Sequence, residues 1–494
     1  MKNKILPLFL TAATMLLSGC KNTNKDTNSD GKEPAETKSY TVMIYLCGSD
    51  LESYSSDYGS YGSQATNNLK EILAIKDSIP DDLNIIVETG GVARNNGHSG
   101  WDNENLQEAQ PGLTLDDSVL QRWKIDKSGM HQIGSNITYS YMSKESTFQS
   151  FMEWGLTDFP AEKTGVILWN HGGAMEGCCY DENASSYYSS DSLTPIELKN
   201  AMSKAFSAVE RTEKLEWVGY DACLMSVADI AYYNSEYFNY MVASQETEPG
   251  GGWDYDNWLD NLCANVNIST VELLSEVCTT YSSKTEADYV AYVAELTEYA
   301  NNSSNFTNWD SEQGAYVDDA GYTAATYLEE AAHYTDFNDA TLAVLDLSKM
   351  EAYKSAFDAM AGSLNSYLSQ NDKYDDFAEN VLEKSQRFGA TSGYFGGESY
   401  PYDTFDASSV ISKIESKYSS ISTSAYKAAL ADVVVHNTTG KSYSTAPCGL
   451  CMYFSYESET AVTSAQAAFP NAYSLMQNLS ADNGGGWDWD DWDF

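Results

Sequence analysis

Five short apolar runs separated by helix-like stretches most constrain the fold of this 494-residue chain. The runs are TVMIYLC (41–47), LNIIVET (83–89), TGVILWNHGG (164–173), EWVGY (216–220) and YMVAS (240–244). A strand that is apolar at successive positions, rather than at alternate ones, is covered on both of its faces. Alternation of such strands with helices predicts an α/β fold with a mostly parallel sheet between two layers of helices.

The stretches between these runs predict the helices. We expect helices at 64–76, 146–154, 194–206 and 224–234. The third begins with Thr194-Pro195-Ile196-Glu197, a capping box with proline at the first helical position. The polar, turn-rich stretch 91–145 contains RWKID (122–126), which predicts one short strand.

Beyond residue 258 the sequence changes to long helical segments rich in Ala and Tyr. Two strand-like runs return late, LAVLDL (342–347) and LCMYFSY (450–456). We therefore expect an α/β domain over 39–258 and a largely helical region over 259–480 that lends one or two strands to the sheet. The acidic, aromatic end at 481–494 is predicted to be a loose tail.

The first 20 residues have the pattern of a targeting segment. Two lysines precede an apolar run that is too short to span a bilayer, and Leu-Ser-Gly-Cys follows. This ending is typical of a bacterial lipobox, which predicts cleavage before Cys20 and lipid attachment to it; a plain cleaved signal is the alternative. The polar residues 21–38 then form a flexible linker outside the cytoplasm.

The chain carries 28 basic and 72 acidic residues, a formal net charge of −44. Such a surface repels phosphate backbones, so nucleic acid is excluded as a natural partner. It attracts cationic peptides or divalent metal ions, although solubility alone would explain the composition equally well.

Nine cysteines lie at positions 20, 47, 178, 179, 223, 263, 278, 448 and 451. Setting aside a lipidated and a catalytic cysteine leaves an odd number, which argues against a complete disulfide framework. Cys448 and Cys451 have the spacing of a redox motif, but no second pair supplies zinc ligands, so we interpret them as buried thiols.

His171 and Cys223 each follow a predicted buried strand. The carboxyl ends of parallel strands share one edge of a sheet, so these two side chains are expected to meet there. A thiolate beside an imidazole, at the start of the helix expected from Leu224, is an activated nucleophile. His171 would serve as general base, and the amides of Gly172 and Cys223 would hold a tetrahedral oxyanion.

Either residue taken alone has an ordinary structural explanation. An isolated cysteine is usually a core thiol, and an isolated histidine is usually a hydrogen-bonded structural residue. Their joint position at two strand ends, with glycines after the histidine, favours catalysis over both explanations.

The motifs WNHGG, DACLMSVADIAY and SQETEPGGGWDY (244–255) resemble those of the clostripain family of cysteine peptidases. The spacing of about 50 residues from His to Cys agrees with the related caspases. The resemblance implies a caspase-like three-layer α/β/α sandwich with His171 and Cys223 as the catalytic dyad. No third member and no cofactor are required.

The resemblance also implies cleavage after Arg or Lys, with Asp221 as the acid that binds the basic side chain. A carboxylate can hold a guanidinium through two hydrogen bonds, but an Asp at this place could equally cap a helix. Glu246 and Glu248, after the fifth strand, are further candidates for this pocket.

Two properties of the family do not transfer directly. Self-cleavage between His and Cys has no basic residue to use from Ala174 to Ile196, so self-processing is absent, is moved to Arg211 or Lys214, or is left to another protease. Calcium dependence would need ligands, for which the acidic loop with Asp181, Glu182 and Asp191 is the candidate.

The sequence thus predicts an exported, lipid-anchored cysteine endopeptidase that acts on basic peptide or protein substrates. The alternative is a non-catalytic surface lipoprotein that binds peptides or glycans through its aromatic-rich C-terminal region.

Overall fold

The computed structural model describes most of the chain beyond the predicted leader. The described residues are 35–53, 62–94, 99–186, 189–302, 307–310, 315–318, 339–392, 398–399, 402–454 and 468–482. Cys20, nearly all of the predicted linker and the acidic tail lie outside them. Within the described part, no helix combines the length and apolar character needed to cross a membrane.

A ten-stranded sheet forms the centre of the fold, with the main strand order β17-β13-β10-β9-β6-β1-β2-β3-β4. Its five inner strands, β10 to β2 in this order, run parallel, and the strands at both edges are antiparallel. The bounds are β1 Lys38–Cys47, β2 Leu83–Gly90, β3 Val119–Asp126, β4 Gly129–Gln132, β5 Ile137–Thr138, β6 Ala161–Trp169, β9 Leu215–Asp221, β10 Phe238–Ala243, β13 Thr341–Asp346 and β17 Val434–Thr439. This is the predicted mostly parallel sheet, with antiparallel additions at each side.

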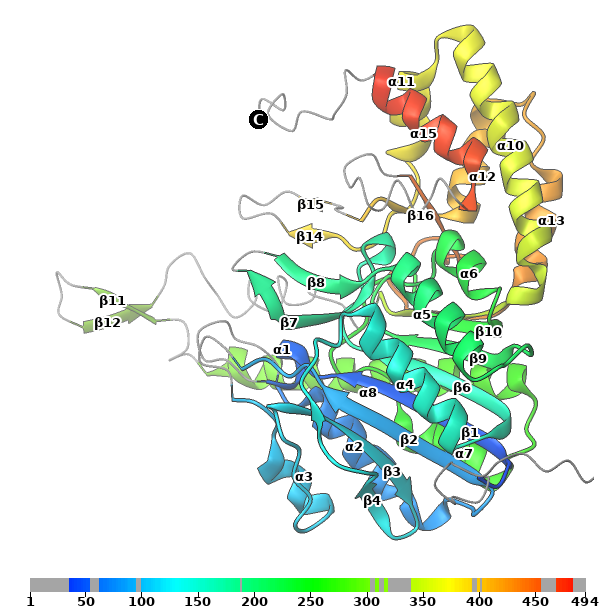
Figure 1. Cartoon of the computed structure of the whole chain (residues 1–494). Helices are drawn as coiled ribbons and strands as arrows, with labels where there is room; N and C mark the ends of the chain where they lie inside the picture. Colours follow the sequence, from blue (N-terminus) through cyan, green and yellow to red (C-terminus); the bar gives the residue numbers. More distant parts are fainter. Residues whose placement is uncertain are drawn as a thin grey trace, which may run out of the picture. The chain divides into compact units, whose positions relative to one another are not determined.

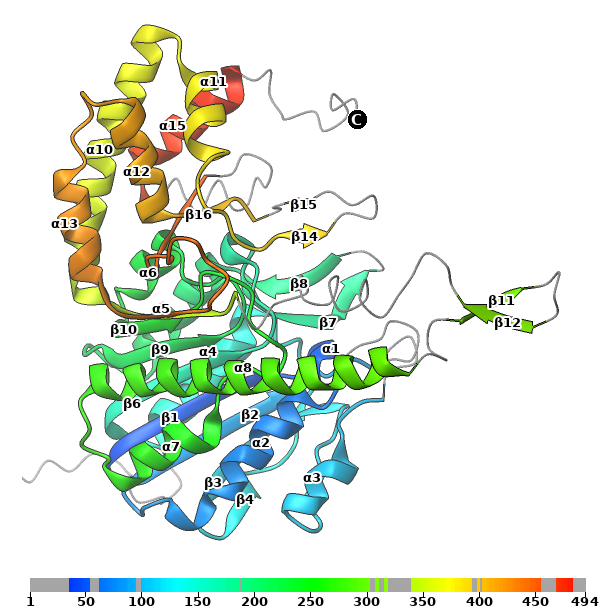
Figure 2. The same cartoon turned by 180° about the vertical axis from the view of Figure 1, so that it is seen from behind.

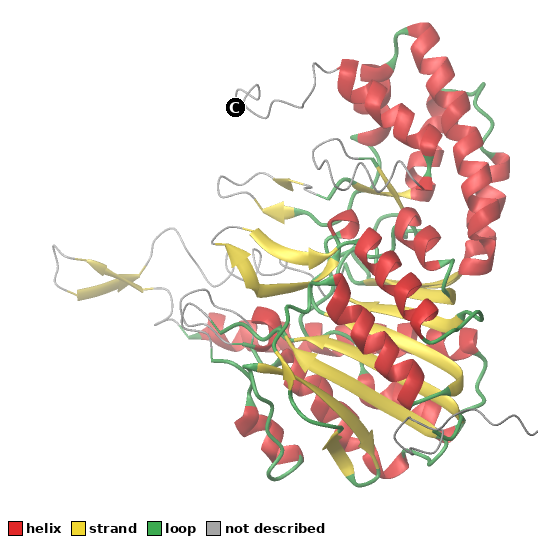
Figure 3. Ribbon diagram, viewed as in Figure 1, coloured by secondary structure: helices red, strands yellow, loops and turns green. Residues whose placement is uncertain are grey.

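Helices cover both faces of the sheet (Figures 1, 2 and 3). One layer contains α4, α5 and α6, and the other contains α2, α7 and the long α8. The helix bounds are α1 Ser49–Glu52, α2 Gln64–Ala74, α3 Asn103–Ala109, α4 Glu145–Asp158, α5 Pro195–Ala208, α6 Ala228–Asn234, α7 Tyr255–Ala264, α8 Thr270–Asn301, α10 Met350–Asn371, α11 Tyr374–Phe377, α12 Ala407–Lys417, α13 Ser424–Val433 and α15 Pro470–Asp482.

The two cores explain why the inner strands are apolar throughout. In β1, Met43 and Tyr45 enter the core shared with α4, whereas Val42 and Ile44 enter the core shared with α2 and α7. Successive side chains of a strand point to opposite faces, so a sheet covered on both sides buries every position. The capping box is present as predicted, since the Thr194 side chain accepts from the Glu197 amide at the start of α5.

The C-terminal region is joined to the same sheet and core. Its strands β13 and β17 extend the sheet beyond β10. The apolar side chains of α10, α13 and α15 belong to the same hydrophobic core as those of α5 and α6. LAVLDL thus enters the sheet as β13, as expected. Four shorter pairs lie outside the sheet: β7 Cys178–Ser186 with β8 Ser189–Leu193, β11 Thr307–Asp310 with β12 Ala315–Asp318, β14 Thr391–Ser392 with β15 Glu398–Ser399, and β16 Thr404–Asp406 with β18 Cys451–Tyr453.

Two expectations about local structure were wrong. The helix expected from Leu224 begins only at Ala228, and the run LCMYFSY supplies β18, which pairs with β16 instead of the large sheet. Both differences have one cause: Val227 forms a parallel bridge with Cys451, and the Ser226 carbonyl accepts from the Cys451 amide at 2.8 Å. Backbone groups that form these long-range hydrogen bonds cannot also form the first hydrogen bonds of a helix.

The sheet leaves no room for a side chain at Gly165 in β6. A Cβ there would lie 2.1 to 2.5 Å from three atoms of the buried Trp217 ring. We predict that Gly165→Ala lowers the free energy of unfolding by about 1 to 3 kcal/mol, because a rigid indole in a packed core cannot move aside cheaply. Urea unfolding measures this. Gly250→Ala, where the nearest atoms are 3.9 Å away, is the control and should change stability by less than about 0.5 kcal/mol. Equal effects of the two variants would refute the packing argument.

Candidate active site

The parallel pairing of β6 with β9 brings His171 and Cys223 to the same edge of the sheet. Trp169 pairs with Asp221 at the end of both strands, so each of the two residues lies two positions past the last pair. The glycine after the histidine makes close contact possible, because a Cβ at Gly172 would lie 2.1 Å from the Cys223 carbonyl oxygen. The structure therefore brings the two predicted catalytic segments into contact.

Cys223 is one of two described cysteines with a partly exposed side chain; the other is Cys448. Its Sγ accepts a hydrogen bond from the Glu248 amide at 3.2 Å. The expected helix N-terminus is not behind it, because Leu224 adopts a left-handed φ of 65° and its amide donates to the Glu246 carbonyl. A main-chain amide, rather than a helix dipole, therefore faces the sulfur.

His171 is oriented by Asp50, a residue that the sequence analysis did not single out. Nε2 of His171 lies 2.8 Å from Oδ1 of Asp50, and both side chains are partly exposed. Burial would raise the pKa of Asp50, but the hydrogen bond and charge of His171 outweigh it and lower this pKa to about 2. A signal was present in the sequence: Asp50 follows the buried run TVMIYLC, whose end lies on the same edge as the other two.

The main chain around His171 is suited to binding an oxyanion. The Cys179 amide donates to the His171 carbonyl, and the Gly173 amide donates to the Gly177 carbonyl, so the start of the β7–β8 hairpin fixes this loop. Within the described residues the Gly172 amide donates no hydrogen bond. An unpaired amide beside the Cys223 backbone is available to a developing negative charge.

Asp221 and Glu248 form a buried acidic pair beside the thiol. Asp221 is only 4% exposed, and its carboxylate accepts from the Tyr255 hydroxyl at 2.9 Å and the Trp253 amide at 3.2 Å. Both carboxylate oxygens of Glu248 are buried and have no hydrogen-bond partner among the described residues. Asp221 does not cap a helix, since the next helix begins seven residues later.

Burial changes the protonation of this pair. It raises the pKa of Asp221 to about 6, although the bonds from Tyr255 and Trp253 act in the opposite direction. Burial, followed by the charge of Asp221, raises the pKa of Glu248 well above its usual range. The charge of Lys284 also lowers the pKa of Asp221, but the Lys284 ammonium group itself lies 2.8 Å from Glu71, so no cation is bound directly to the two carboxyl groups in the described part of the chain.

A glycine loop closes the acidic pair on one side. Gly252 has a left-handed φ of 56°, and a Cβ there would lie 2.7 Å from Oδ1 of Asp221. From α8, Nζ of Lys284 binds the carbonyl oxygens of Gly251 and Trp253 at 2.9 and 3.0 Å. The buried, unpartnered hydroxyl of Tyr281 belongs to the same surroundings, because the charges of Glu248, Cys223 and Asp221 add to the raising of its pKa by burial.

Glu246 is directed elsewhere. Its Oε1 accepts from the amides of Thr247 and Gly389, both at 2.8 Å, which ties the loop after β10 to the C-terminal region. Burial raises the pKa of Glu246 to about 7. The structure therefore brings Glu248, but not the Glu246 carboxylate, together with Asp221.

The carboxylates of the acidic loop considered for calcium have hydrogen-bond partners within the protein. Asp181 is buried, and its oxygens accept from the Tyr139 hydroxyl and from the amides of Met142 and Asn183, while Asp191 accepts from Ser143. Across the described ranges, no group of three or more His, Cys, Asp and Glu side chains is arranged to hold a metal ion.

The basic residues considered for self-cleavage lie far from Cys223 along the sheet. Arg211 and Lys214 are in the loop before β9, at the opposite end of this strand from Cys223. Their cleavage by Cys223 of the same molecule would therefore require large rearrangement.

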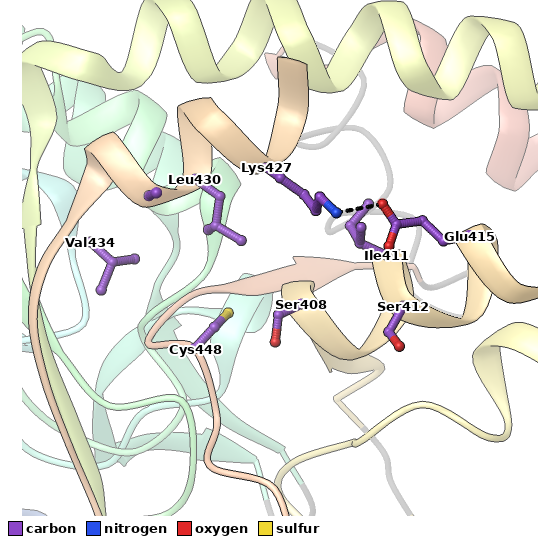
Figure 4. A pocket seen from close by; sticks show the side chains of 9 residues that line it. Ser408, Ile411, Ser412, Glu415, Lys427, Leu430, Val434 and Cys448 are labelled. Atoms are coloured by element: carbon purple, nitrogen blue, oxygen red, sulfur yellow. Dashed lines mark hydrogen bonds and ion pairs between the residues drawn. The ribbon is translucent and has the colours of Figure 1, made fainter. Parts of the chain in front are cut away.

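One cavity lies away from this site. It has a volume of about 520 Å³ between α12 and α13, with Cys448 at its wall and a Lys427–Glu415 ion pair at 2.6 Å across it (Figure 4). Burial raises the pKa of Cys448 to about 12, so its thiol is a poor nucleophile. None of the residues that line this cavity belongs to the site around Cys223.

Comparison with known proteins agrees with this geometry. The model of the clostripain family matches residues 44–482. A secreted C11 cysteine protease from Bacteroides thetaiotaomicron in complex with an irreversible peptide inhibitor has a similar structure, with a TM-score of 0.52, 14% identity, and coverage of 89% of this chain and 99% of the other. A second structure of a secreted C11 cysteine protease from Bacteroides thetaiotaomicron, "iotapain", gives a TM-score of 0.53 at 13% identity, with coverage of 89% and 100%.

No curated protein matches the sequence significantly. The family match spans nearly all of the α/β domain and the whole helical region, and the shared fold has the predicted caspase-like architecture. The chain belongs to the clostripain family and is a cysteine peptidase.

Proposed function

We propose that this chain is an endopeptidase that cleaves peptide bonds after Arg or Lys, with Cys223 as nucleophile and His171 as proton carrier. The observation that carries the specificity is the acidic pair: the Glu248 amide donates to the Cys223 sulfur, and the buried Glu248 carboxyl group lies beside that of Asp221. A guanidinium or ammonium group placed there neutralises buried negative charge immediately beside the nucleophile.

The chemistry runs through an acyl-enzyme. His171 takes the thiol proton, Cys223 attacks the carbonyl carbon, and the amides of Gly172 and Cys223 bind the resulting oxyanion. Collapse of the tetrahedral species forms a thioester and expels the amine, which receives the proton from His171. Water, deprotonated by His171, then hydrolyses the thioester by the same route.

The proposed location is outside the cytoplasm. The lipobox at Cys20 supports cleavage and lipid anchoring to a membrane surface, and the similar structures are of secreted proteases. The net charge of −44 would favour basic peptides and disfavour nucleic acid as partners.

A fluorogenic peptide ending in Arg tests the nucleophile and the basic preference together. We predict that the wild-type chain without its leader hydrolyses this peptide, and that Cys223→Ala lowers kcat/KM by more than about 1000-fold, because the acyl-enzyme cannot form. Cys448→Ala, the other partly exposed thiol, is the control and should retain activity. Hydrolysis that survives Cys223→Ala would rule out the assigned nucleophile.

The acidic pair is tested separately from the nucleophile. We predict that Asp221→Asn and Glu248→Gln each lower kcat/KM for the Arg peptide by about 100-fold, since a charge-assisted bond to the substrate is lost. Hydrolysis of a peptide with citrulline, a neutral isostere of Arg, should change much less. Glu246→Gln is the matched control, because this neighbouring carboxylate is bound to the Gly389 amide. A loss for both peptides alike would contradict a role in charge recognition.

The raised pKa of Asp221 predicts a specific pH dependence. This carboxyl is protonated below about pH 6 in the free enzyme and ionised above it, so its attraction for a cation is present at neutral pH and is lost on acidification. The ratio of kcat/KM for the Arg peptide to that for the citrulline peptide should fall about tenfold between pH 7.5 and pH 5. The ratio cancels the titration of the catalytic residues. A ratio that is constant over this range would refute the prediction.

A further inference from the structure

The histidine that serves the thiol is bound by a carboxylate which the dyad mechanism leaves without a task. Asp50 lies three residues past the end of β1, and its Oδ1 is 2.8 Å from Nε2 of His171. An ionised carboxylate can only accept a hydrogen bond, so Nε2 must carry the proton in this pair. The other ring nitrogen, Nδ1, is then left as the one that exchanges protons.

A chain of hydrogen bonds from Asn170 through Ser49 orients Asp50 toward the histidine. Ser49 donates from Oγ to Oδ1 of Asp50 at 3.0 Å, and Asn170, the residue before His171, donates from Nδ2 to Ser49 Oγ at 2.8 Å. The same Asn170 nitrogen also binds the Cys47 carbonyl at the end of β1. The carboxylate and the imidazole are therefore held by two neighbouring strands, β1 and β6, that are joined just behind the pair.

The backbone of Ser49, the residue before Asp50, has an unfavourable conformation. Ser49 has a φ of 45°, in the left-handed region that a residue with a side chain rarely adopts. The turn is fixed on its other side, because the Ser49 amide donates to the Gly91 carbonyl and the Ser49 carbonyl accepts from the Ala93 amide. Strain that the surroundings hold in place is typical of functional sites.

Stability alone does not account for the pair. The Asp50 and His171 side chains are 32% and 40% exposed, and ion pairs with such exposure contribute little to folding. The buried residues Asn170 and Ser49 nevertheless hold this partly exposed ion pair in place through hydrogen bonds. This arrangement favours a role in the reaction over a role in folding stability.

We propose that Asp50 is a positioning residue that fixes the proton of His171 on Nε2, turns Nδ1 toward the reaction and stabilises the imidazolium that forms when Cys223 loses its proton. This rests on the roles proposed above for Cys223 and His171. The thiol proton moves to Nδ1 and later to the leaving amine, and the Nε2 proton stays shared with Asp50. The carboxylate itself gains no proton at any step.

The test uses alkylation by iodoacetamide, which needs no assumption about substrate specificity. The rate of labelling of Cys223, read by mass spectrometry of its peptide, follows the fraction of thiolate. In the wild type this rate should stay high at pH 5 to 7, where the imidazolium supports the thiolate. In Asp50→Asn, which keeps an oxygen acceptor but loses the charge, reactivity in this range should fall about tenfold, because a facing negative charge no longer holds the imidazolium.

Turnover supplies the second readout. For any peptide that the wild type cleaves, Asp50→Ala should lower kcat by about 100-fold with little change in KM, and Asp50→Asn by less. The alkaline limb of the kcat/KM profile should move to lower pH by about one unit in Asp50→Asn. A role in folding alone would move neither profile.

Asp126→Asn is the matched control, because Asp126 pairs with His131 in another ion pair of similar exposure, 3.7 Å apart, at a distant hairpin. This variant should match the wild type in both readouts.

If Asp50→Asn retains wild-type pH profiles for alkylation and kcat, the proposal is wrong, even if the chain proves to cleave after Arg. If alkylation changes as expected while no Arg peptide is cleaved, the positioning role stands and the specificity proposal fails. Should Asp50→Ala not fold, Asp50→Asn decides the question alone.

Discussion

The parallel register between β6 and β9 is the constraint on which the site depends. Trp169 lies opposite Asp221, and His171 and Cys223, the proposed base and nucleophile, each lie two residues further on. A strand rises about 3.3 Å per residue, so a slip of two residues would move the Cys223 sulfur by more than 6 Å relative to His171. Burial on both faces fixes this register, because any slip would misplace Trp217 and Gly165, which fit together in the core.

Four neighbouring strands each place one part of the site at this edge. β1 leads to Asp50, β6 to His171, β9 to Cys223 with Asp221, and β10 to Glu248. The proposed catalytic and substrate-binding side chains thereby come from different strand ends, apart from β9, which leads to both Cys223 and Asp221. The Asp50 and His171 side chains are partly exposed to solvent, with which they can exchange protons. The Asp221 and Glu248 side chains are buried, and electrostatic interactions between charges are stronger in the low-dielectric interior.

The sequence was sufficient for the parts of the fold that follow from periodicity. Continuous apolar runs predicted the inner strands, the capping box predicted the start of α5, and the two strand ends predicted that His171 and Cys223 would meet. It was insufficient where long-range pairing overrides local preference. Leu224 to Val227 has the apolar spacing of a helix, yet its backbone is taken by Ser244, Glu246 and Cys451. The contact of Asp50 with His171 also depends on the three-dimensional structure. The left-handed conformation of Ser49 and the hydrogen bond from Asn170 to Ser49 orient the Asp50 side chain, and neither can be predicted from local sequence.

The turn at Cys448 to Cys451 shows why the helical region cannot be separated from the catalytic one. Gly449 donates its amide to the Gln245 side chain and accepts at its carbonyl from Ser226, so it binds the loops that follow β9 and β10 at once. These loops carry the nucleophile and Glu248. The extended segment after Cys223 is a consequence of this binding, and it removes the helix dipole that would otherwise favour a thiolate. In the proposed mechanism, the Glu248 amide and an imidazolium of His171 that faces Asp50 would take over this stabilisation of the sulfur.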